Sequence, residues 1–237
     1  MISIVIPAYK EAENLKFILP QIKKVMNKRK LEYEILVVDT MKPMDDTKQI
    51  CIDNEVRYVP RQNGNSYGDA IRTGFDSAQG EFTVVMDADG SHDPKDILKF
   101  YKVIQNHKID LVIGSRYCRG GQTENTFILK FMSWALNVSY RIFFKLNVHD
   151  VSDSFRMYRT EQLKQLKFEC NNFDIVEEIL IKLSIINKPF IAYEVPIKFN
   201  QRVYGESKRK LLKFIFSYVK TMYRLRKIKS KAHLQIP

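Results

Sequence analysis

Two carboxylates, Asp87 and Asp89, stand one residue apart directly after an apolar run, in the segment VVMDADGSHDP. At the end of one strand both can turn toward a common cation, and hard ions such as Mg²⁺ or Mn²⁺ prefer oxygen ligands. Proteins usually hold Mg²⁺ by one or two carboxylates together with substrate phosphates, so the pair predicts a substrate with a diphosphate. The alternative is an acidic turn in which Ser91 or Asp93 caps the helix that begins at Pro94.

Polar side chains also follow two other apolar runs. Tyr9 and Glu11 come after the run 2–6, and Asp39 comes after the run 34–38. The carboxyl ends of parallel strands meet at one edge of a sheet, where ligands bind. The sequence therefore predicts one site that combines these side chains with the carboxylate pair. Neither GxGxxG after the first run nor GxxxxGK[ST] is present, which disfavours dinucleotide and P-loop sites.

Short apolar runs alternate with helical patterns, as in an α/β fold with a helix-covered parallel sheet. The expected strands are 2–6, 34–38, 56–59, 82–86 and 111–113, and the helices between them are 13–27, 47–54, 70–78 and 95–106. After residue 121 the pattern predicts a helix over 127–146, a strand over 155–158, a helix over 175–186, a strand over 191–199 and a helix from about Arg209. We expect a catalytic domain over 1–206, which includes helix 127–146, and a basic helix and tail over 207–237.

The basic residues are concentrated at one end of the chain. The 237 residues carry a formal net charge of +12, and ten of the 39 Lys and Arg lie in 207–237, which contains no Asp or Glu. A basic amphipathic helix favours an anionic partner, either acidic lipid or nucleic acid, and the alternative is a solvated helix face. Because no nucleic-acid-binding signature accompanies this segment, we expect an anionic membrane surface and no nucleic acid as partner.

Helix 127–146 has a narrow polar stripe and a wide apolar remainder that includes Trp134. The stripe consists of Lys130, Ser133, Asn137, Arg141 and Lys145. The remainder is either buried against the domain or laid on a membrane, and the charges argue against a transmembrane span. Three scattered cysteines without CxxC spacing favour a reducing compartment. We therefore expect a cytoplasmic protein that binds peripherally to the inner face of a membrane.

Several motifs together resemble glycosyltransferase family 2, and within it the dolichol-phosphate mannose synthase group, which includes bacterial polyprenyl-phosphate sugar synthases. They are PAYKEAE, the Asp after the second run, NGNSYGDAIRTG, MDADGSHDP, VIGSRYCRGG, DVSDSFRMYR and EVPIKFNQRVYGESKRK, in the order and spacing of the family. The resemblance covers the chain to about residue 215. It implies a GT-A fold, a GDP- or UDP-linked sugar donor, a polyprenyl phosphate acceptor and Mg²⁺ or Mn²⁺ as cofactor.

The resemblance also implies roles for individual residues. Donor contacts are implied for Pro7, Tyr9, Glu11, Val38, Asp39, Asp87, Ala88, Asp89, Arg116, Arg202 and Lys208. Metal ligation is implied for Asp87, Asp89 and Ser91, and a catalytic role for Asp89, Arg116 and Arg202. The three basic residues match positions that contact donor or acceptor phosphates in the group. For the two arginines the alternative is an ordinary ion pair, although Arg suits bidentate phosphate contact.

The expected reaction is inverting transfer of a mannose- or glucose-type hexose to a polyprenyl phosphate such as dolichyl or undecaprenyl phosphate. An ionised phosphate needs no strong base, whereas a sugar-hydroxyl acceptor, the alternative within the family, would need one. Candidate bases are Asp153, Glu177 and Glu178, although both glutamates can simply face solvent.

Three further residues carry smaller expectations. His92 is expected to have a loop or capping role rather than to bind the metal. Thr40 stands where the group commonly has a second Asp, which leaves the nucleobase open. Leu129 stands where the group often has an Arg, so we expect acceptor recognition to differ from that of a dolichol-phosphate enzyme.

Overall fold

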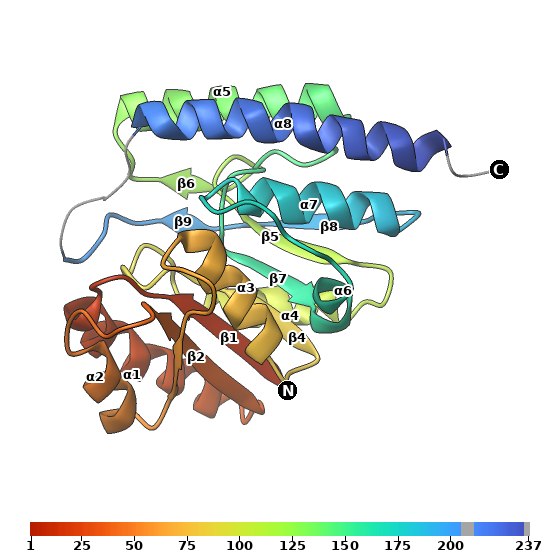
Figure 1. The fold of residues 1–237 in the computed structure, drawn as a ribbon. Helices are drawn as coiled ribbons and strands as arrows, with labels where there is room; N and C mark the ends of the chain where they lie inside the picture. Colours follow the sequence, from red (N-terminus) through yellow and green to blue (C-terminus); the bar gives the residue numbers. More distant parts are fainter. Residues whose placement is uncertain (205–210, 235–237) are drawn as a thin grey trace.

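The computed structural model describes residues 1–204 and 211–234, and within the last helix the side chains of 217–229. Seven strands form one sheet in the order β3-β2-β1-β4-β7-β5-β8 (Figure 1). They are β1 (Ile2–Pro7), β2 (Tyr33–Asp39), β3 (Arg57–Pro60), β4 (Phe82–Val85), β5 (Leu111–Ser115), β7 (Arg156–Arg159) and β8 (Ala192–Pro196). The short strands β6 (Gln122–Thr123) and β9 (Lys198–Phe199) pair with each other in parallel.

The sheet is mostly parallel, with one exception near its centre. β1 to β4 run parallel, and β5 pairs in parallel with β8. β7 lies between β4 and β5 and runs antiparallel to both, so the five strands of the predicted series keep one direction and the later strand is inserted against it. Because Arg156 at the start of β7 pairs with Val85 at the end of β4, loop 150–155 reaches the carboxyl end of β4.

Helices cover both faces of the sheet. One face packs against α1 (Ala12–Lys28), α2 (Thr47–Asp53) and α4 (Asp96–Ile104), and the other against α3 (Tyr67–Ser77), α6 (Thr160–Lys164) and α7 (Ile175–Ile186). In β1, Ile4 and Ile6 enter the first core and Val5 the second, which explains why this strand is apolar on both faces. α3 begins three residues before the predicted start because Ser66 and Asp69 form a capping box.

An outer layer consists of α5 (Phe127–Phe144) and α8 (Leu211–Leu234), which lie side by side beyond α7 (Figure 1). The Tyr140 hydroxyl donates to the Tyr218 carbonyl at 2.9 Å, and the Arg226 guanidinium lies 4.5 Å from the centre of the Phe143 ring. No helix among the described residues is long and apolar enough to span a bilayer. The predicted division between residues 206 and 207 falls outside the described residues, and it stays a prediction.

Hydrogen bonds fasten α8 to α7. The Asp174 carboxylate accepts from the hydroxyls of Ser217 at 2.9 Å and Thr221 at 2.6 Å. Arg224 donates to Glu178 at 3.2 Å, so this basic residue of the last helix contacts the domain. The carboxylate of Glu178 is buried, and pairing with Arg224 offsets its desolvation. The part of the last helix from Ser217 to Arg224 is therefore packed onto the domain.

Candidate active site

The carboxylate pair lies at the carboxyl edge of the sheet, as predicted. Asp89 Oδ1 accepts hydrogen bonds from the backbone N–H of Ser91 at 3.0 Å and from its hydroxyl at 2.6 Å. The Ser154 hydroxyl donates to Asp87 Oδ1 at 3.0 Å. Ala88, between the two carboxylates, is buried. Of the two residues in the predicted capping alternative, Ser91 bonds to Asp89, whereas Asp93 Oδ1 accepts the Lys95 N–H at 2.9 Å in the turn that leads into α4.

Asp89 is favoured in its charged form. Burial would raise the pKa of its carboxyl, but the hydrogen bonds from Ser91 and the nearby charge of Arg202 outweigh burial and lower the pKa. Arg202 Nη2 lies 3.1 Å from Asp89 Oδ2. An ionised carboxylate attracts cations, and the guanidinium beside it attracts phosphates. The pair is therefore suited to a site that binds both.

Arg202 joins the carboxylate pair to the segment after β1. Its Nη1 lies 3.4 Å from Glu11 Oε1, and Asn14 Nδ2 donates to the other oxygen of Glu11 at 2.5 Å. Tyr9, two residues before Glu11, is 38% exposed. Three of the predicted donor residues, Glu11, Asp89 and Arg202, are thus in direct contact. Lys208 lies outside the described residues.

Arg202 belongs to a short segment, 200–204, which we call the strap. The strap crosses the turn that holds the carboxylate pair. Asn200 N–H donates to the Ser91 carbonyl and Val203 N–H donates to the Asp89 carbonyl, both at 2.9 Å. Gly90 has a positive φ of 80°, and a Cβ there would lie 2.5 Å from Val203 Cγ2. Only glycine allows this approach without displacement, so the turn is shaped to receive the strap.

The predicted nucleoside residues lie at the ends of β1 and β2. Pro7 and Val38 are adjacent in register and buried, and Asp39 is fully buried. Asp39 accepts from the Tyr58 hydroxyl at 3.2 Å, and burial raises the pKa of its carboxyl. The sequence reasoning missed Tyr58, because nothing in a tyrosine on β3 reveals that it faces the end of β2. The Thr40 hydroxyl donates to the Lys42 carbonyl at 2.7 Å and shapes the following turn.

Arg116 follows β5 and is held by two buried carboxylates. Its Nε donates to Asp150 Oδ2 at 2.8 Å and lies 3.1 Å from Asp153 Oδ2, and its Nη2 donates to Asp150 Oδ1 at 2.8 Å. Burial lowers the pKa of Arg116, but the two carboxylates outweigh burial and raise it. Nη2 also donates to the hydroxyls of Ser152 at 2.8 Å and Ser133 at 3.3 Å. We call these five residues the Arg116 cluster; the ion-pair interpretation of Arg116 is the one its contacts show, and its phosphate contact stays a prediction.

His92 lies in a loop, as expected, but its ring is buried between the carboxylate pair and the Arg116 cluster. Nδ1 accepts the backbone N–H of Asp87 at 3.2 Å, and Nε2 lies 3.4 Å from Asp153 Oδ1. The ring stacks on Phe155 with a centroid distance of 4.6 Å. The contacts of His92 therefore run to both groups of candidate site residues.

Neither predicted glutamate faces solvent. Glu177 and Glu178 are both fully buried, because the sheet packs on one side of α7 and α8 packs on the other. Glu178 pairs with Lys182 at 2.8 Å as well as with Arg224. Burial raises the pKa of Glu177 well above its usual range, and neither of its carboxylate oxygens has a hydrogen-bond partner among the described residues. The third candidate base, Asp153, is occupied with Arg116, so these contacts do not favour any of the three as a base.

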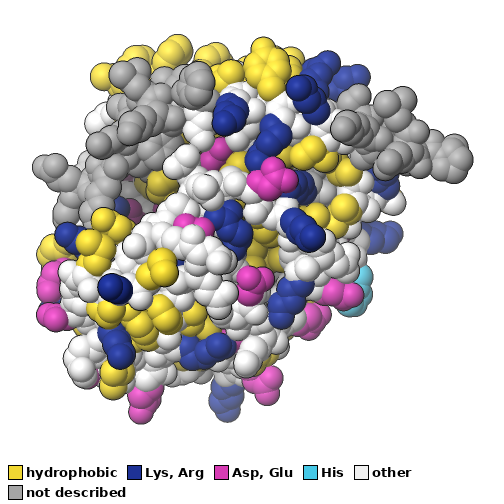
Figure 2. Space-filling model, in the orientation of Figure 1, with side chains coloured by type: hydrophobic (Ala, Val, Ile, Leu, Met, Phe, Trp, Pro, Cys, Tyr) yellow, Lys and Arg dark blue, Asp and Glu magenta, His cyan; other side chains and the backbone are white. Residues whose placement is uncertain are grey.

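The middle of the polar stripe of α5, at Ser133 and Asn137, faces inward, whereas Lys130 and Lys145 at its ends are exposed, as is much of the apolar remainder. Asn137 is 2% exposed and accepts the Val151 N–H at 3.0 Å, and Ser133 belongs to the Arg116 cluster. Only Tyr140 and Phe144 among the large apolar side chains of α5 are buried. The exposed apolar residues are Phe127, Ile128, Leu129, Phe131, Trp134 and Ile142. Figure 2 shows hydrophobic and basic side chains together along the edge of the molecule formed by α5 and α8.

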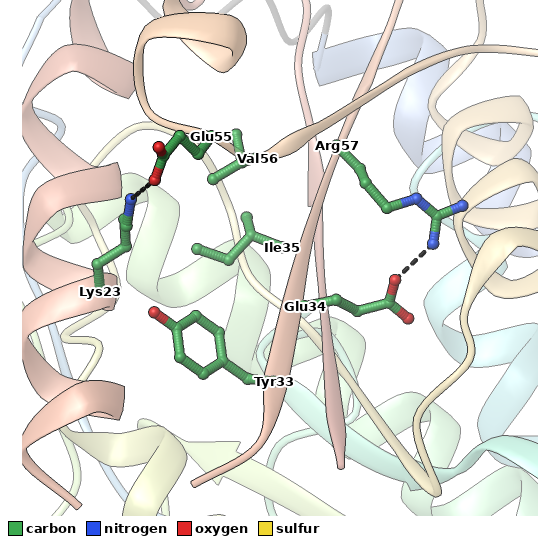
Figure 3. Close-up of a pocket in the computed structure, with 7 residues that line it drawn as sticks. All are labelled: Lys23, Tyr33, Glu34, Ile35, Glu55, Val56 and Arg57. Carbon is green, nitrogen blue, oxygen red and sulfur yellow. Dashed lines mark hydrogen bonds and ion pairs between the residues drawn. The ribbon is translucent and has the colours of Figure 1, made fainter. Parts of the chain in front are cut away.

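A hollow of about 390 Å³ lies elsewhere, at the amino end of β2 (Figure 3). Its lining residues are Lys23, Tyr33, Glu34, Ile35, Glu55, Val56 and Arg57. Two ion pairs, Lys23 with Glu55 at 3.6 Å and Arg57 with Glu34 at 2.5 Å, border it. Because β2 begins at this hollow and ends at Asp39, the hollow and the carboxylate edge are at opposite ends of the strand.

The mixed sheet, with a carboxylate pair after a central strand and charged side chains at the same edge, is the architecture of nucleotide-sugar transferases. The sequence profile of glycosyl transferase family 2 matches residues 3–167. The chain belongs to this family and is a glycosyltransferase, which confirms the resemblance stated from its motifs.

Two curated relatives are similar over most of the chain. A dolichol-phosphate mannosyltransferase from Pyrococcus furiosus is 35% identical over 233 residues, which are 95% of this chain and 64% of the relative. An undecaprenyl-phosphate mannosyltransferase from Micrococcus luteus is 31% identical over 216 residues, 86% of this chain and 85% of the relative. The chain thus spans less than two thirds of the length of the Pyrococcus protein.

Solved structures confirm the GT-A fold. Glucosyl-3-phosphoglycerate synthase from Mycobacterium tuberculosis, in complex with Mn²⁺, uridine diphosphate and glucosyl-3-phosphoglycerate, superposes with a TM-score of 0.73. The superposition covers 95% of this chain and 79% of that one at 17% identity. The same synthase with Mg²⁺ and uridine diphosphate gives a TM-score of 0.72, with 16% identity and coverage of 95% and 79%. At these identities the likeness concerns the fold alone.

Proposed function

We propose that this protein transfers a hexose from a nucleoside-diphosphate sugar, linked to GDP or UDP, to a polyprenyl phosphate at a membrane surface. One observation carries the proposal: the polar stripe of α5 contacts the Arg116 cluster through Ser133, while the apolar face of the same helix is exposed. A lipid phosphate has the matching composition, an anionic head and an apolar chain. The names of the two curated relatives support a lipid phosphate acceptor.

The donor is expected at the carboxyl edge of β1, β2 and β4. The described residues contain no cluster of three or more His, Cys, Asp or Glu that could hold a metal ion, so a divalent ion there needs ligands from its substrate. Two carboxylates and the Ser91 hydroxyl are oxygen ligands of the kind that Mg²⁺ or Mn²⁺ takes together with substrate phosphates. Asp87 and Asp89 would hold the ion, which as a Lewis acid would stabilise negative charge on the departing diphosphate.

The two arginines are suited to different parts of this chemistry. Arg116 is 8% exposed and held by several contacts, so it supplies fixed positive charge next to Ser133 and Ser152. Arg202 has about a quarter of its side chain exposed and pairs with Glu11 and Asp89. Both place positive charge where two anionic reactants must approach, and such preorganised charge lowers a barrier without reorganisation. A phosphate acceptor needs no proton removed, which agrees with the absence of a suited base among the three candidates.

The membrane contact is expected at α5 and α8. Neither helix contains an Asp or Glu. The exposed basic residues Lys130, Lys145, Lys220, Arg226 and Lys227 accompany the exposed apolar residues of α5. Apolar burial and attraction to anionic headgroups act together in such helices. We propose that the protein binds peripherally through this surface, on the inner face of the membrane where cytoplasmic nucleotide sugars are available.

The test is a reconstituted transfer reaction. Purified protein is mixed with vesicles that contain undecaprenyl phosphate, with GDP-mannose or UDP-glucose, and with Mg²⁺ or Mn²⁺. We expect labelled sugar in the lipid extract. Asp89→Asn should reduce the rate by about 100-fold or more, since it removes a charge that acts on the developing diphosphate.

Asp93→Asn is the matched control, because Asp93 lies in the same loop and its carboxylate is directed to the Lys95 backbone N–H at 2.9 Å. It should retain near wild-type activity. Transfer to a sugar hydroxyl in place of the lipid phosphate would refute the proposed acceptor and leave the glycosyltransferase assignment intact.

A further inference from the structure

We propose that His92 is a positioning residue that couples the carboxylate pair to the Arg116 cluster, so that donor and acceptor groups keep a fixed relative geometry. The inference rests on the proposed function for the identity of the two substrates. It assigns a role to a side chain that is 1% exposed and therefore cannot contact either substrate in this arrangement.

The contacts of His92 define its tautomer. Asp87 donates its backbone N–H to Nδ1 at 3.2 Å, so Nδ1 carries no proton. The proton of the neutral ring is then on Nε2, which lies 3.4 Å from Asp153 Oδ1 without the alignment of a hydrogen bond, so the contact between them is electrostatic. One nitrogen therefore faces the turn that holds the carboxylate pair, and the other faces a carboxylate that holds Arg116.

Aromatic neighbours fix the plane of the imidazole. Phe155 stacks on it at 4.6 Å with an interplanar angle of 17°, and Phe199 meets it edge-on at 5.4 Å. Phe155 N–H also donates to Asp153 Oδ1 at 2.8 Å, so the ring that supports His92 belongs to the same turn as its acidic partner. Rotation of the ring away from Asp153 would disturb this stack.

A second link runs parallel to the first. Ser154 donates to Asp87 Oδ1 at 3.0 Å, and it follows Asp153 directly in the chain. Loop 150–155 is therefore attached to the turn after β4 at two points, and it supplies both carboxylates that orient Arg116. Since small displacements of reacting groups reduce rates strongly, a link of this kind has a direct effect on transfer.

The alternative is that His92 only fills space between phenylalanine rings. Three variants separate the two interpretations. His92→Asn keeps an oxygen near Nδ1 and loses the group that faces Asp153, His92→Gln reaches the Nε2 position with an N–H donor, and His92→Phe keeps the packed ring alone.

We expect His92→Asn and His92→Phe to raise the KM for polyprenyl phosphate by about tenfold with little change in the KM for the donor. His92→Gln should restore the acceptor KM to within about threefold of wild type. Equal effects of all three variants on both KM values, or wild-type kinetics in His92→Phe, would overturn the inference.

A second measurement does not depend on activity. In ¹H–¹⁵N spectra the Nε–H signal of Arg116, assigned by its loss in Arg116→Lys, should keep its position in His92→Gln and shift in His92→Asn. An unchanged signal in all variants would refute the coupling even where transfer occurs. If the protein makes no lipid-linked sugar, the proposed function fails, and the spectra still decide whether His92 positions Arg116.

Discussion

Replacement of Phe127 by serine tests whether the apolar face of α5 enters a lipid interface. Phe127 is the first residue of α5, and 83% of its surface is exposed. The helix cap does not depend on this side chain, since the Thr126 hydroxyl accepts the Leu129 N–H at 3.5 Å. The substitution therefore removes apolar surface and leaves the cap and the inward part of the polar stripe in place.

The exposed fraction sets the size of the effect. Complete burial of a phenylalanine side chain contributes about 1.5–3 kcal/mol. Because 83% of Phe127 is still exposed, its insertion into the interface retains most of that range, about 1–2.5 kcal/mol. Each 1.4 kcal/mol corresponds to a factor of ten, so we expect the vesicle partition coefficient to fall about 5- to 60-fold.

The assay is sedimentation with vesicles of mixed phosphatidylglycerol and phosphatidylcholine, at several lipid concentrations. Phe17→Ser is the control, since Phe17 is 47% exposed but lies on α1, away from the outer helix layer (Figure 1). Phe127→Ser should keep the thermal unfolding midpoint of the wild type, whereas Phe17→Ser should lower it by about 2–4 °C, because about half of Phe17 is buried. Equal partitioning of the two variants would show that the outer face of α5 is not the lipid contact, and the membrane proposal would fail.

Two further predictions concern stability. Gly68→Ala should lower the free energy of unfolding by about 1–3 kcal/mol, because a Cβ there would lie 2.2 Å from the backbone oxygen of Cys170. Urea titration measures this difference, and an unchanged unfolding midpoint would contradict the close packing at Gly68. Burial raises the pKa of Glu177, so the stability associated with its neutral form is present at low pH and is lost as the pH rises through the raised value. Glu177→Gln should therefore stabilise the protein more at pH 8 than at pH 5 relative to wild type, and an equal difference at both pH values would refute it.

The elements near the carboxylate edge could be predicted because their signals are local. An apolar run such as 2–6 forms a strand in any packing that buries both faces, and parallel strands bring their carboxyl ends to one edge. Asp87 and Asp89 therefore lie where their position after β4 indicated. The insertion of β7 beside β4 could not be predicted in this way, because strand order depends on contacts between distant segments.

The side-chain partners of the site residues could not be predicted from the sequence for the same reason. Arg202 is 113 residues from Asp89, and Arg116 is 34 residues from Asp150, so spacing along the chain does not indicate either pair. Periodicity also defined two faces of α5 without indicating which one is inward. For Glu177 a signal was available: α7 is apolar on nearly every side, which is typical of a fully buried helix.

The orientation of α5 links the two halves of the proposed reaction. A helix that packs by its apolar face would leave its polar stripe in solvent, far from any lipid chain. α5 instead buries Asn137 and turns Ser133 inward together with Tyr140 and Phe144, because buried Asp150 and Arg116 supply partners for the two polar side chains. These hydrogen bonds offset the cost of turning polar side chains inward. They also place hydroxyl and guanidinium groups next to the exposed apolar surface of the helix. An acceptor with its chain on that surface would present its phosphate to the Arg116 cluster, which His92 and Ser154 connect to the carboxylate pair.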